Sequence, residues 1–346
     1  GRIGFMQGRV RASLAAHQQA LALRRRLVDR VGLMNTLNAL AMTYLWLGDY
    51  PHAEETCLEA FDFISRVGDL PVVASLHTYY AASRLYRGDL SKVEAHLLAG
   101  LDVARRLDLL SVQAHTMAWL GYYYKVIGQL DRALDLSGRA ATTLADLPLP
   151  RWQVWAGAVV VAVCTESGKA ERALQLAARL LDRADQWHLI PDRAVALAEL
   201  AQARLTIGQA ANAEQVIAEL LKVANACDMA EYQIRARWLL GQLRLMQGNP
   251  AAALPALTQA CTQAEQSEAR LLLWRLRATL GDAHWTLSQN DQAEANYRAA
   301  WQVLTEIANT LPDPTARPWM LALPAAHRLQ GILAAWPRAD RAPTDG

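Results

Sequence analysis

The stretch Gly48-Asp49-Tyr50-Pro51-His52-Ala53, closed by Ala60, sets the pattern of the chain. Its first glycine recurs at a constant interval, at Gly8, Gly48, Gly88, Gly128, Gly168, Gly208 and Gly248, and Ser288 takes the next place. Only 19 glycines occur in 346 residues, so this alignment is not chance. A fixed period of about 40 residues is typical of a solenoid built from one repeated supersecondary unit.

Small and apolar residues on both sides of the turn follow a helical period of i, i+3, i+4 and i+7. Around Gly48 they are Leu37, Leu40, Ala41 and Tyr44 before the turn, and Ala53, Cys57, Ala60, Phe61 and Ile64 after it. The glycine can adopt a positive φ and end the first helix, and Asp49 can cap the second. Each unit is therefore predicted to be a helix A, a tight turn and a helix B.

The repeat predicts an all-α fold with one long domain. An α-solenoid of about seven and a half antiparallel helix pairs is expected over residues 1–308, with turns at 8, 48, 88, 128, 168, 208, 248 and 288. Proline-rich sequence after Asn309 predicts short capping helices over 309–337, and the polar end predicts a disordered tail over 338–346. Because Gly1 falls in the middle of a helix A, we expect the sequence to be a piece of a longer protein.

Composition argues against several classes of protein. The net charge is only +2, and the basic run Arg24-Arg25-Arg26 is isolated, so no basic face for nucleic acid is expected. The four cysteines lie far apart, which favours reduced thiols in a cytoplasmic protein over a disulfide framework or a zinc site. The longest uncharged stretch, 31–48, contains Asn35, Thr36 and Asn38 and fits a repeat helix better than a membrane span.

Catalytic motifs are absent from the sequence. There is no phosphate-binding loop, no GxGxxG, no HExxH and no GxSxG. His115 has no second ligand-type residue at helical spacing, so no metal and no cofactor are predicted. Cys57 and Cys261 fall on buried helix B positions, and the pair Glu54-Glu55 is expected to be solvated on the outer helix. The protein is therefore not expected to be an enzyme.

The repeat resembles the tetratricopeptide repeat. Gly48-Asp49-Tyr50 with Ala41, Ala53 and Ala60 carries the resemblance, and 121–128, Gly-Tyr-Tyr-Tyr-Lys-Val-Ile-Gly, is closer still to the consensus. A period of about 40 residues would also suit HEAT or armadillo repeats, since the standard tetratricopeptide unit has about 34, but the Gly-x-x-x-x-Ala register favours tetratricopeptide. The long form is similar to the sensor arms of bacterial signalling ATPases such as the maltose-regulon activator.

The resemblance implies a right-handed superhelix whose concave groove is lined by helix A, at fixed distances before each turn glycine. The candidate groove residues are Asn35, Asn38, Trp46, Tyr86, His115, Tyr122, Lys125, Trp155, Gln202, Arg235, Trp238, Gln242, Arg275, Asp282 and Trp285. Large aromatic side chains anchor partners at low entropic cost, although they can also fill the inner curve of the superhelix. Arg235 and Arg275, one repeat apart, could together clamp a carboxylate or phosphate.

The leading hypothesis is a non-catalytic scaffold whose groove binds a protein, a peptide or a small effector. It would serve as the sensor or regulatory arm of a larger bacterial signalling or transcription-regulating protein. The alternative is a purely structural assembly module for self-association or for docking domains of the same chain. RNA binding by helical repeats would require a basic groove, which the sequence does not provide.

Overall fold

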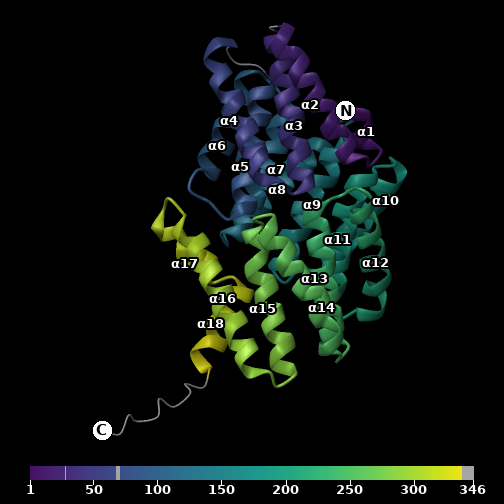
Figure 1. Cartoon of the computed structure of the whole chain (residues 1–346), viewed down its shortest axis with the longest axis vertical. Helices are drawn as coiled ribbons and strands as arrows, with labels where there is room; N and C mark the ends of the chain where they lie inside the picture. The colour runs from purple at the N-terminus through teal and green to yellow at the C-terminus, as the bar shows by residue number, and fades with distance from the viewer. Residues whose placement is uncertain (28, 68–70, 337–346) are drawn as a thin grey trace.

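The computed structural model describes residues 1–27, 29–67 and 71–336, and within them it contains only helices. After the short α1 (Arg2–Met6), pairs of antiparallel helices follow one another along the chain (Figure 1). Helices A are α3 (Arg30–Leu47), α5 (Pro71–Arg87), α7 (Leu110–Val126), α9 (Pro150–Glu166), α11 (Ile190–Thr206), α13 (Ala230–Met246) and α15 (Arg270–Thr286). Helices B are α2 (Val10–Leu27), α4 (Tyr50–Val67), α6 (Val93–Arg106), α8 (Leu130–Ala145), α10 (Ala170–Gln186), α12 (Ala210–Ala226), α14 (Pro250–Gln266) and α16 (Asn290–Asn309). The predicted all-α solenoid is confirmed.

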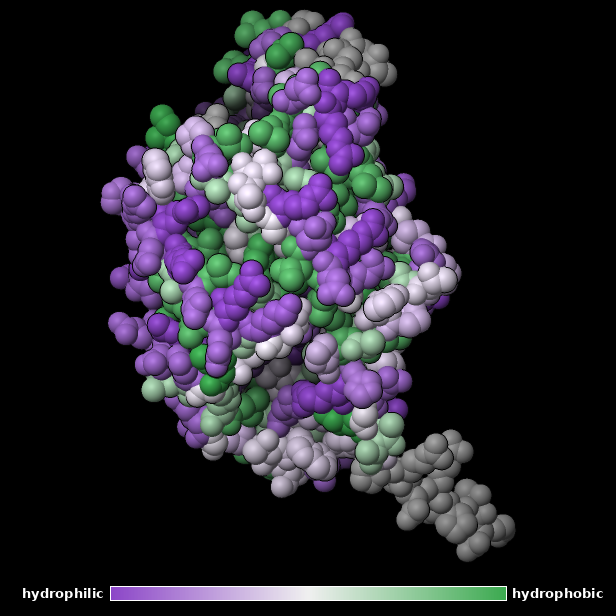
Figure 2. Space-filling view, turned by 180° about the vertical axis from the view of Figure 1, so that it is seen from behind, coloured by the Kyte–Doolittle hydropathy of each residue, from purple (hydrophilic) through white to green (hydrophobic). Residues whose placement is uncertain are grey.

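Helices A form the inside of the superhelix because they are apolar or small on nearly every face. In α11, twelve of the 17 residues are buried, whereas in α10 only Ala173, Ala177, Leu180 and Ala184 are buried, along one stripe. Each helix A packs against the next one, as α3 does against α5 and α5 against α7, and helices B cover them from outside. From behind, hydrophilic residues cover most of the outer surface (Figure 2).

Each repeat contains two turns in which one residue has the left-handed backbone conformation. The turn glycines have φ between 71° and 83°, and Ser288, with φ 59°, replaces glycine in the last turn. Halfway to the next glycine, between helix B and the following helix A, Asp108, His188, Asp228 and Glu268 also have positive φ. In these four repeats no glycine marks this second turn in the sequence, and Gly68, at the equivalent position, lies outside the described residues. Pro148 falls at the same place in its own repeat, and because its ring fixes φ at about −65° that turn follows a different path.

The superhelix is wound so tightly that successive turns touch. The Gly8 turn lies against Ile190, the Gly48 turn against Ala230, and the Gly88 turn against Arg270, with the same separation along the chain in each case. A Cβ atom on Gly48 would lie 2.7 Å from the Cβ of Ala230. We call this line of contacts between superhelical turns the seam. It joins each early glycine turn to the start of a helix A about four and a half repeats further along the chain, and it forms a wall of the interior.

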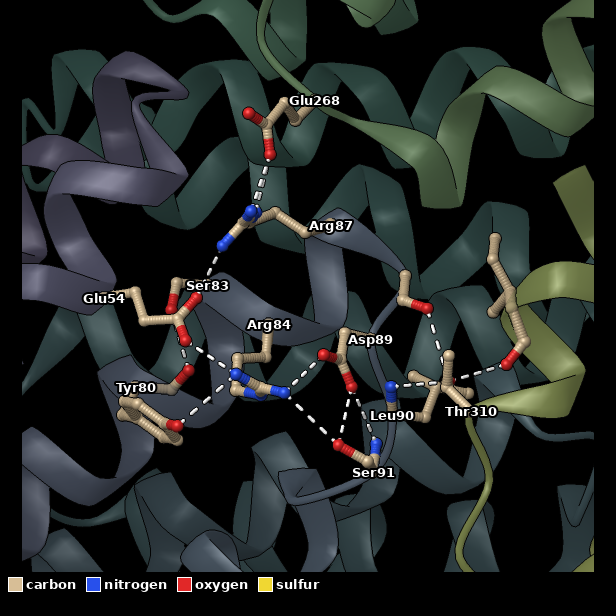
Figure 3. Close-up of polar contacts among 12 residues, drawn as sticks. Glu54, Tyr80, Ser83, Arg84, Arg87, Asp89, Leu90, Ser91, Glu268 and Thr310 are labelled. Carbon is tan, nitrogen blue, oxygen red and sulfur yellow. Dashed lines mark hydrogen bonds and ion pairs between the residues drawn. The ribbon is translucent and has the colours of Figure 1, made fainter.

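Charged side chains reinforce this seam (Figure 3). Glu54 accepts from Arg84 at 2.6 Å and from Arg87 at 2.7 Å, and Arg87 also pairs with Glu268 across the seam at 2.7 Å. The Glu54 side chain is only 11% exposed, so the prediction that Glu54 is solvated was wrong. On the same seam the Thr310 hydroxyl accepts a hydrogen bond from the Leu90 N–H at 2.8 Å. The prediction failed because Arg84 and Arg87 of the adjacent helix α5 cover this face of α4 and pair with Glu54.

The chain beyond α16 folds back along the array. A short 3-10 turn (Pro314–Ala316) leads into α17 (Arg317–Leu321) and α18 (Pro324–Ala335). The carbonyl of Trp319 in α17 lies against the Gly128 turn, where a Cβ atom would come within 2.3 Å of it. α18 packs against α16 and borders the interior. The predicted disordered tail, 338–346, lies outside the described residues, and no described helix is long and apolar enough to cross a membrane.

Candidate ligand-binding channel

A cavity of about 1010 Å³ lies inside the superhelix. Its walls come from helices A of the third to the seventh complete pairs, α7, α9, α11, α13 and α15, and from α17 and α18. This volume is at the upper end of the range for drug-sized ligands, about 300–1,000 Å³. We call this cavity the channel.

A second, smaller hollow of about 80 Å³ is lined mainly by aromatic side chains. Trp119 and Trp155 lie 4.4 Å apart between ring centroids, and Tyr122, which borders the channel, packs against Trp155 at 5.8 Å. Trp155 Nε1 and His115 Nδ1 are buried with no hydrogen-bond partner. His115 Nε2 accepts from Trp119 at 3.3 Å, and burial lowers the pKa of His115 to about 3, so its Nδ1 carries the proton of a neutral ring.

The structure brings most of the candidate groove residues together. Eight line the channel: Tyr122, Lys125, Gln202, Arg235, Trp238, Gln242, Arg275 and Asp282. Four line the aromatic hollow: Trp46, Tyr86, His115 and Trp155. The remaining three line neither: Asn35, Asn38 and Trp285. Asn35 is exposed, and the Trp285 ring packs 5.0 Å from Trp336, so neither side chain contributes to the two cavities.

Several polar side chains of the channel have one partner each. Arg235 pairs with Glu199 at 2.6 Å. Asp282 accepts from both Arg328 Nη atoms, at 3.0 and 2.7 Å, and from the Tyr297 hydroxyl at 2.7 Å. Such one-to-one pairing is how proteins keep buried charges.

Glu166 has two cationic neighbours. One Arg275 nitrogen, Nη2, donates to both Glu166 oxygens at 3.1 and 3.2 Å, and Lys125 Nζ lies 3.9 Å from the same carboxylate. Burial raises the pKa of Glu166, but Arg275 and Lys125 outweigh burial and hold that pKa below its usual value. Arg235 and Arg275 are therefore paired with two different carboxylates, Glu199 and Glu166, and their joint binding of one carboxylate or phosphate stays a prediction.

Glu231 is a buried acid beside the aromatic hollow. It is 6% exposed, and burial raises its pKa to about 7, against the opposing effects of Arg235 and of a hydrogen bond from Tyr86. Glu199 adds to the rise because two carboxylates repel each other. A pKa of about 7 leaves Glu231 partly protonated at neutral pH, chiefly because the side chain is buried.

Sequence reasoning missed five charged residues of the two cavities: Arg151, Asp192, Glu199, Glu231 and Arg328. Three of them, Arg151, Asp192 and Glu231, lie in the first turn of a helix A. In an open superhelix, side chains of this first turn would not line the groove. They reach the interior because the seam brings these first turns against the early repeats. Asp192 follows Pro191 in a helix that also contains Arg193, Glu199 and Arg204, so its charge alone does not distinguish it in the sequence.

The His, Cys, Asp and Glu side chains of the described residues form no metal centre. No group of three of them in 1–27, 29–67 and 71–336 is placed to hold a metal ion. The four cysteines are buried and free, and burial raises the pKa of Cys57 above its usual value. Burial therefore disfavours the reactive thiolate form of Cys57.

A family model described as the MalT-like TPR region matches residues 1–273. The chain belongs to this family. No curated protein sequence matches this MalT-like chain.

Solved structures show the same fold at low sequence identity. A Rap protein complexed with competence and sporulation factor is 12% identical, with a TM-score of 0.63 over 94% of this chain and 99% of that one. The Rap conjugation gene regulator of plasmid pLS20, in complex with the Phr* peptide, is 14% identical, with a TM-score of 0.64 over 81% and 76%. A signal transduction ATPase with a tetratricopeptide repeat sensor from Pyrococcus horikoshii is 11% identical, with a TM-score of 0.50 over 74% and 41%.

Proposed function

We propose that this MalT-like array is a non-catalytic sensor arm that binds a short peptide in its channel. The observation that carries the proposal is the cavity of about 1010 Å³ inside the superhelix, in which aromatic and charged side chains of five helices A meet. A large globular partner would require an open concave face, whereas the seam walls this interior. A short extended chain fits the space and would meet both aromatic surfaces and hydrogen-bonding groups.

Two comparisons support a peptide and a regulatory role. One structural neighbour is a Rap regulator in complex with a peptide. Another has its repeats as the sensor of a longer signal transduction ATPase. By this analogy the array would be one part of a larger bacterial signalling or transcription-regulating protein in the cytoplasm. Ligand binding would then be reported to the rest of that protein through the helices that wall the channel.

The test is to fill the channel. Ala162 lines it, so Ala162→Trp places an indole in the cavity, while Ala178→Trp adds the same side chain on the exposed face of α10. Pentapeptide libraries are incubated with each protein, and retained peptides are quantified by mass spectrometry and calorimetry. We expect micromolar or tighter peptides for the wild type and for Ala178→Trp, and at least tenfold weaker binding for Ala162→Trp. Equal binding by all three proteins would place the peptide outside the channel.

A further inference from the structure

Most of the positive charges along the two cavities have a carboxylate of their own. Arg235 has Glu199, Arg328 has Asp282, and in the aromatic hollow Arg151 has Asp192 at 2.9 Å. Lys125 and Arg275, by contrast, share the single carboxylate of Glu166.

The ammonium of Lys125 is poorly satisfied. Its side chain is 18% exposed, and its 3.9 Å distance to Glu166 is too long for a hydrogen bond. In the part of the chain that the structure describes, Lys125 makes no hydrogen bond, and its closest other interaction is with the Tyr122 ring, 5.6 Å from the centroid. Burial, together with Arg275, lowers the pKa of Lys125 more than Glu166 raises it. Its three N–H donors are therefore available to an acceptor in the channel, either water or a group of a ligand.

Arg275 also has donors to spare. Only its Nη2 is used on Glu166, which leaves Nη1 and Nε without a protein acceptor among the described residues. Its guanidinium lies 4.6 Å from the Trp274 ring centroid, so the aromatic ring holds its plane in the channel wall. Lys125 on α7 and Arg275 on α15 thus present free donors into one cavity, with Glu166 between them.

We propose that Lys125 and Arg275 together bind one carboxylate of the ligand that occupies the channel. This inference rests on the proposed function and names the chemical group that the channel selects. The cluster carries two positive charges and one negative charge, so one carboxylate completes its balance, whereas a phosphate, with a charge of about −1.5 to −2, would overshoot it. The carboxylate is either the C-terminus of the peptide or an acidic side chain within it.

Three libraries of N-acetylated pentapeptides separate these sources. The first lacks Asp and Glu and ends in a free carboxylate. The second ends in an amide and contains one Asp or Glu, and the third ends in an amide and contains no acid. We expect peptides from either the first or the second library to bind at least tenfold tighter than their counterparts in the third, and the preferred library identifies the source.

Matched variants tie the preference to the site. In Lys125→Met, with Lys125→Gln as a second variant, the preference for an acid should fall below threefold. In Lys222→Met, the same change on the exposed side of α12, the preference should remain. If peptides from all three libraries bind wild-type protein equally, the carboxylate site is wrong while the proposed function stands. If none is retained, peptide binding itself is wrong, and this inference falls with it.

Discussion

The close contact between superhelical turns can be tested with two glycines that differ in one respect. Gly48 and Gly208 have nearly the same left-handed backbone, with φ of 74° and 79°. A Cβ atom on Gly48 would lie 2.7 Å from the Cβ of Ala230, whereas a Cβ atom on Gly208 would meet nothing within 4 Å. Gly48→Ala therefore adds a steric clash to the backbone strain that Gly208→Ala produces alone.

The two costs can be estimated separately. An alanine in the left-handed region costs roughly 1–2 kcal/mol, and this applies to both variants. Carbon atoms pack best about 3.5–4.0 Å apart, so the Gly48→Ala methyl must push the start of α13 away by about 1 Å. Overpacking of this kind costs about 1–3 kcal/mol. We therefore expect Gly208→Ala to lower the free energy of unfolding by roughly 1–2 kcal/mol and Gly48→Ala by roughly 2–5 kcal/mol.

Urea denaturation of both variants, with a rescue variant, measures the difference. Ala230→Gly removes the atom that the new methyl meets and leaves the next neighbours at 3.7 and 3.8 Å, an ordinary contact. The double variant Gly48→Ala/Ala230→Gly should thus recover the overpacking cost of about 1–3 kcal/mol as coupling energy. Hydrogen exchange at the first turn of α13 should be faster in Gly48→Ala alone. Equal losses for the two single variants, with no coupling to Ala230, would refute the close packing of the seam.

Buried charges allow three further tests. Glu54→Gln removes the buried carboxylate that Arg84 and Arg87 share, although Asp89 and Glu268 remain beside them, and should lower the free energy of unfolding by roughly 2 kcal/mol. Glu55→Gln, at an exposed neighbour, should change it by less than about 0.5 kcal/mol, and equal effects of the two variants in a urea titration would contradict the buried pairing. The folded protein holds a proton on Glu231 up to about pH 7, whereas an ordinary glutamate releases it near pH 4.5. The stability of the wild type should therefore fall relative to that of Glu231→Gln as the pH rises from about 4.5 to about 7, by up to roughly 3 kcal/mol. If the melting temperatures of the two proteins change in parallel from pH 4 to 8, Glu231 is not the titrating group. The charged and titratable groups that face Glu231 are Tyr50, Tyr86, Tyr122, Glu199, Tyr232 and Arg235, and they are the same in both proteins. Lys125→Met should raise the melting temperature, by the equivalent of about 1 kcal/mol, because it removes a confined ammonium and leaves Glu166 paired with Arg275, whereas a drop would indicate that Lys125 stabilises the free protein.

The repeat pattern predicted the fold because the signals that define each helix pair lie close together in the sequence. A glycine at a constant interval and small residues at fixed distances from it determine where each helix ends and which face packs. The same register placed Trp238, Arg275 and Lys125 in the interior, since the inner face of each helix A is set by its own period. The winding of the superhelix over several repeats has no comparable signal in the sequence. Asn35 and Trp285 have the same register as their channel-lining equivalents, but Asn35 is exposed near one end of the array, and the Trp285 ring packs against Trp336, which follows α18.

The tightness of the superhelix decides which residues become functional. Gly48 approaches Ala230 only because the small rotations between many successive helices add up to one full superhelical turn. The sequence of a single repeat does not determine this total rotation. Once the turns touch, the first turns of later helices A close the interior, and Glu231 and Asp192 become buried acids instead of solvated ones. The glycine at the turn therefore has a second role beyond its positive φ. Because glycine has no side chain, successive superhelical turns can pack against each other at the seam. This packing turns an open groove into a channel that can select its ligand by charge.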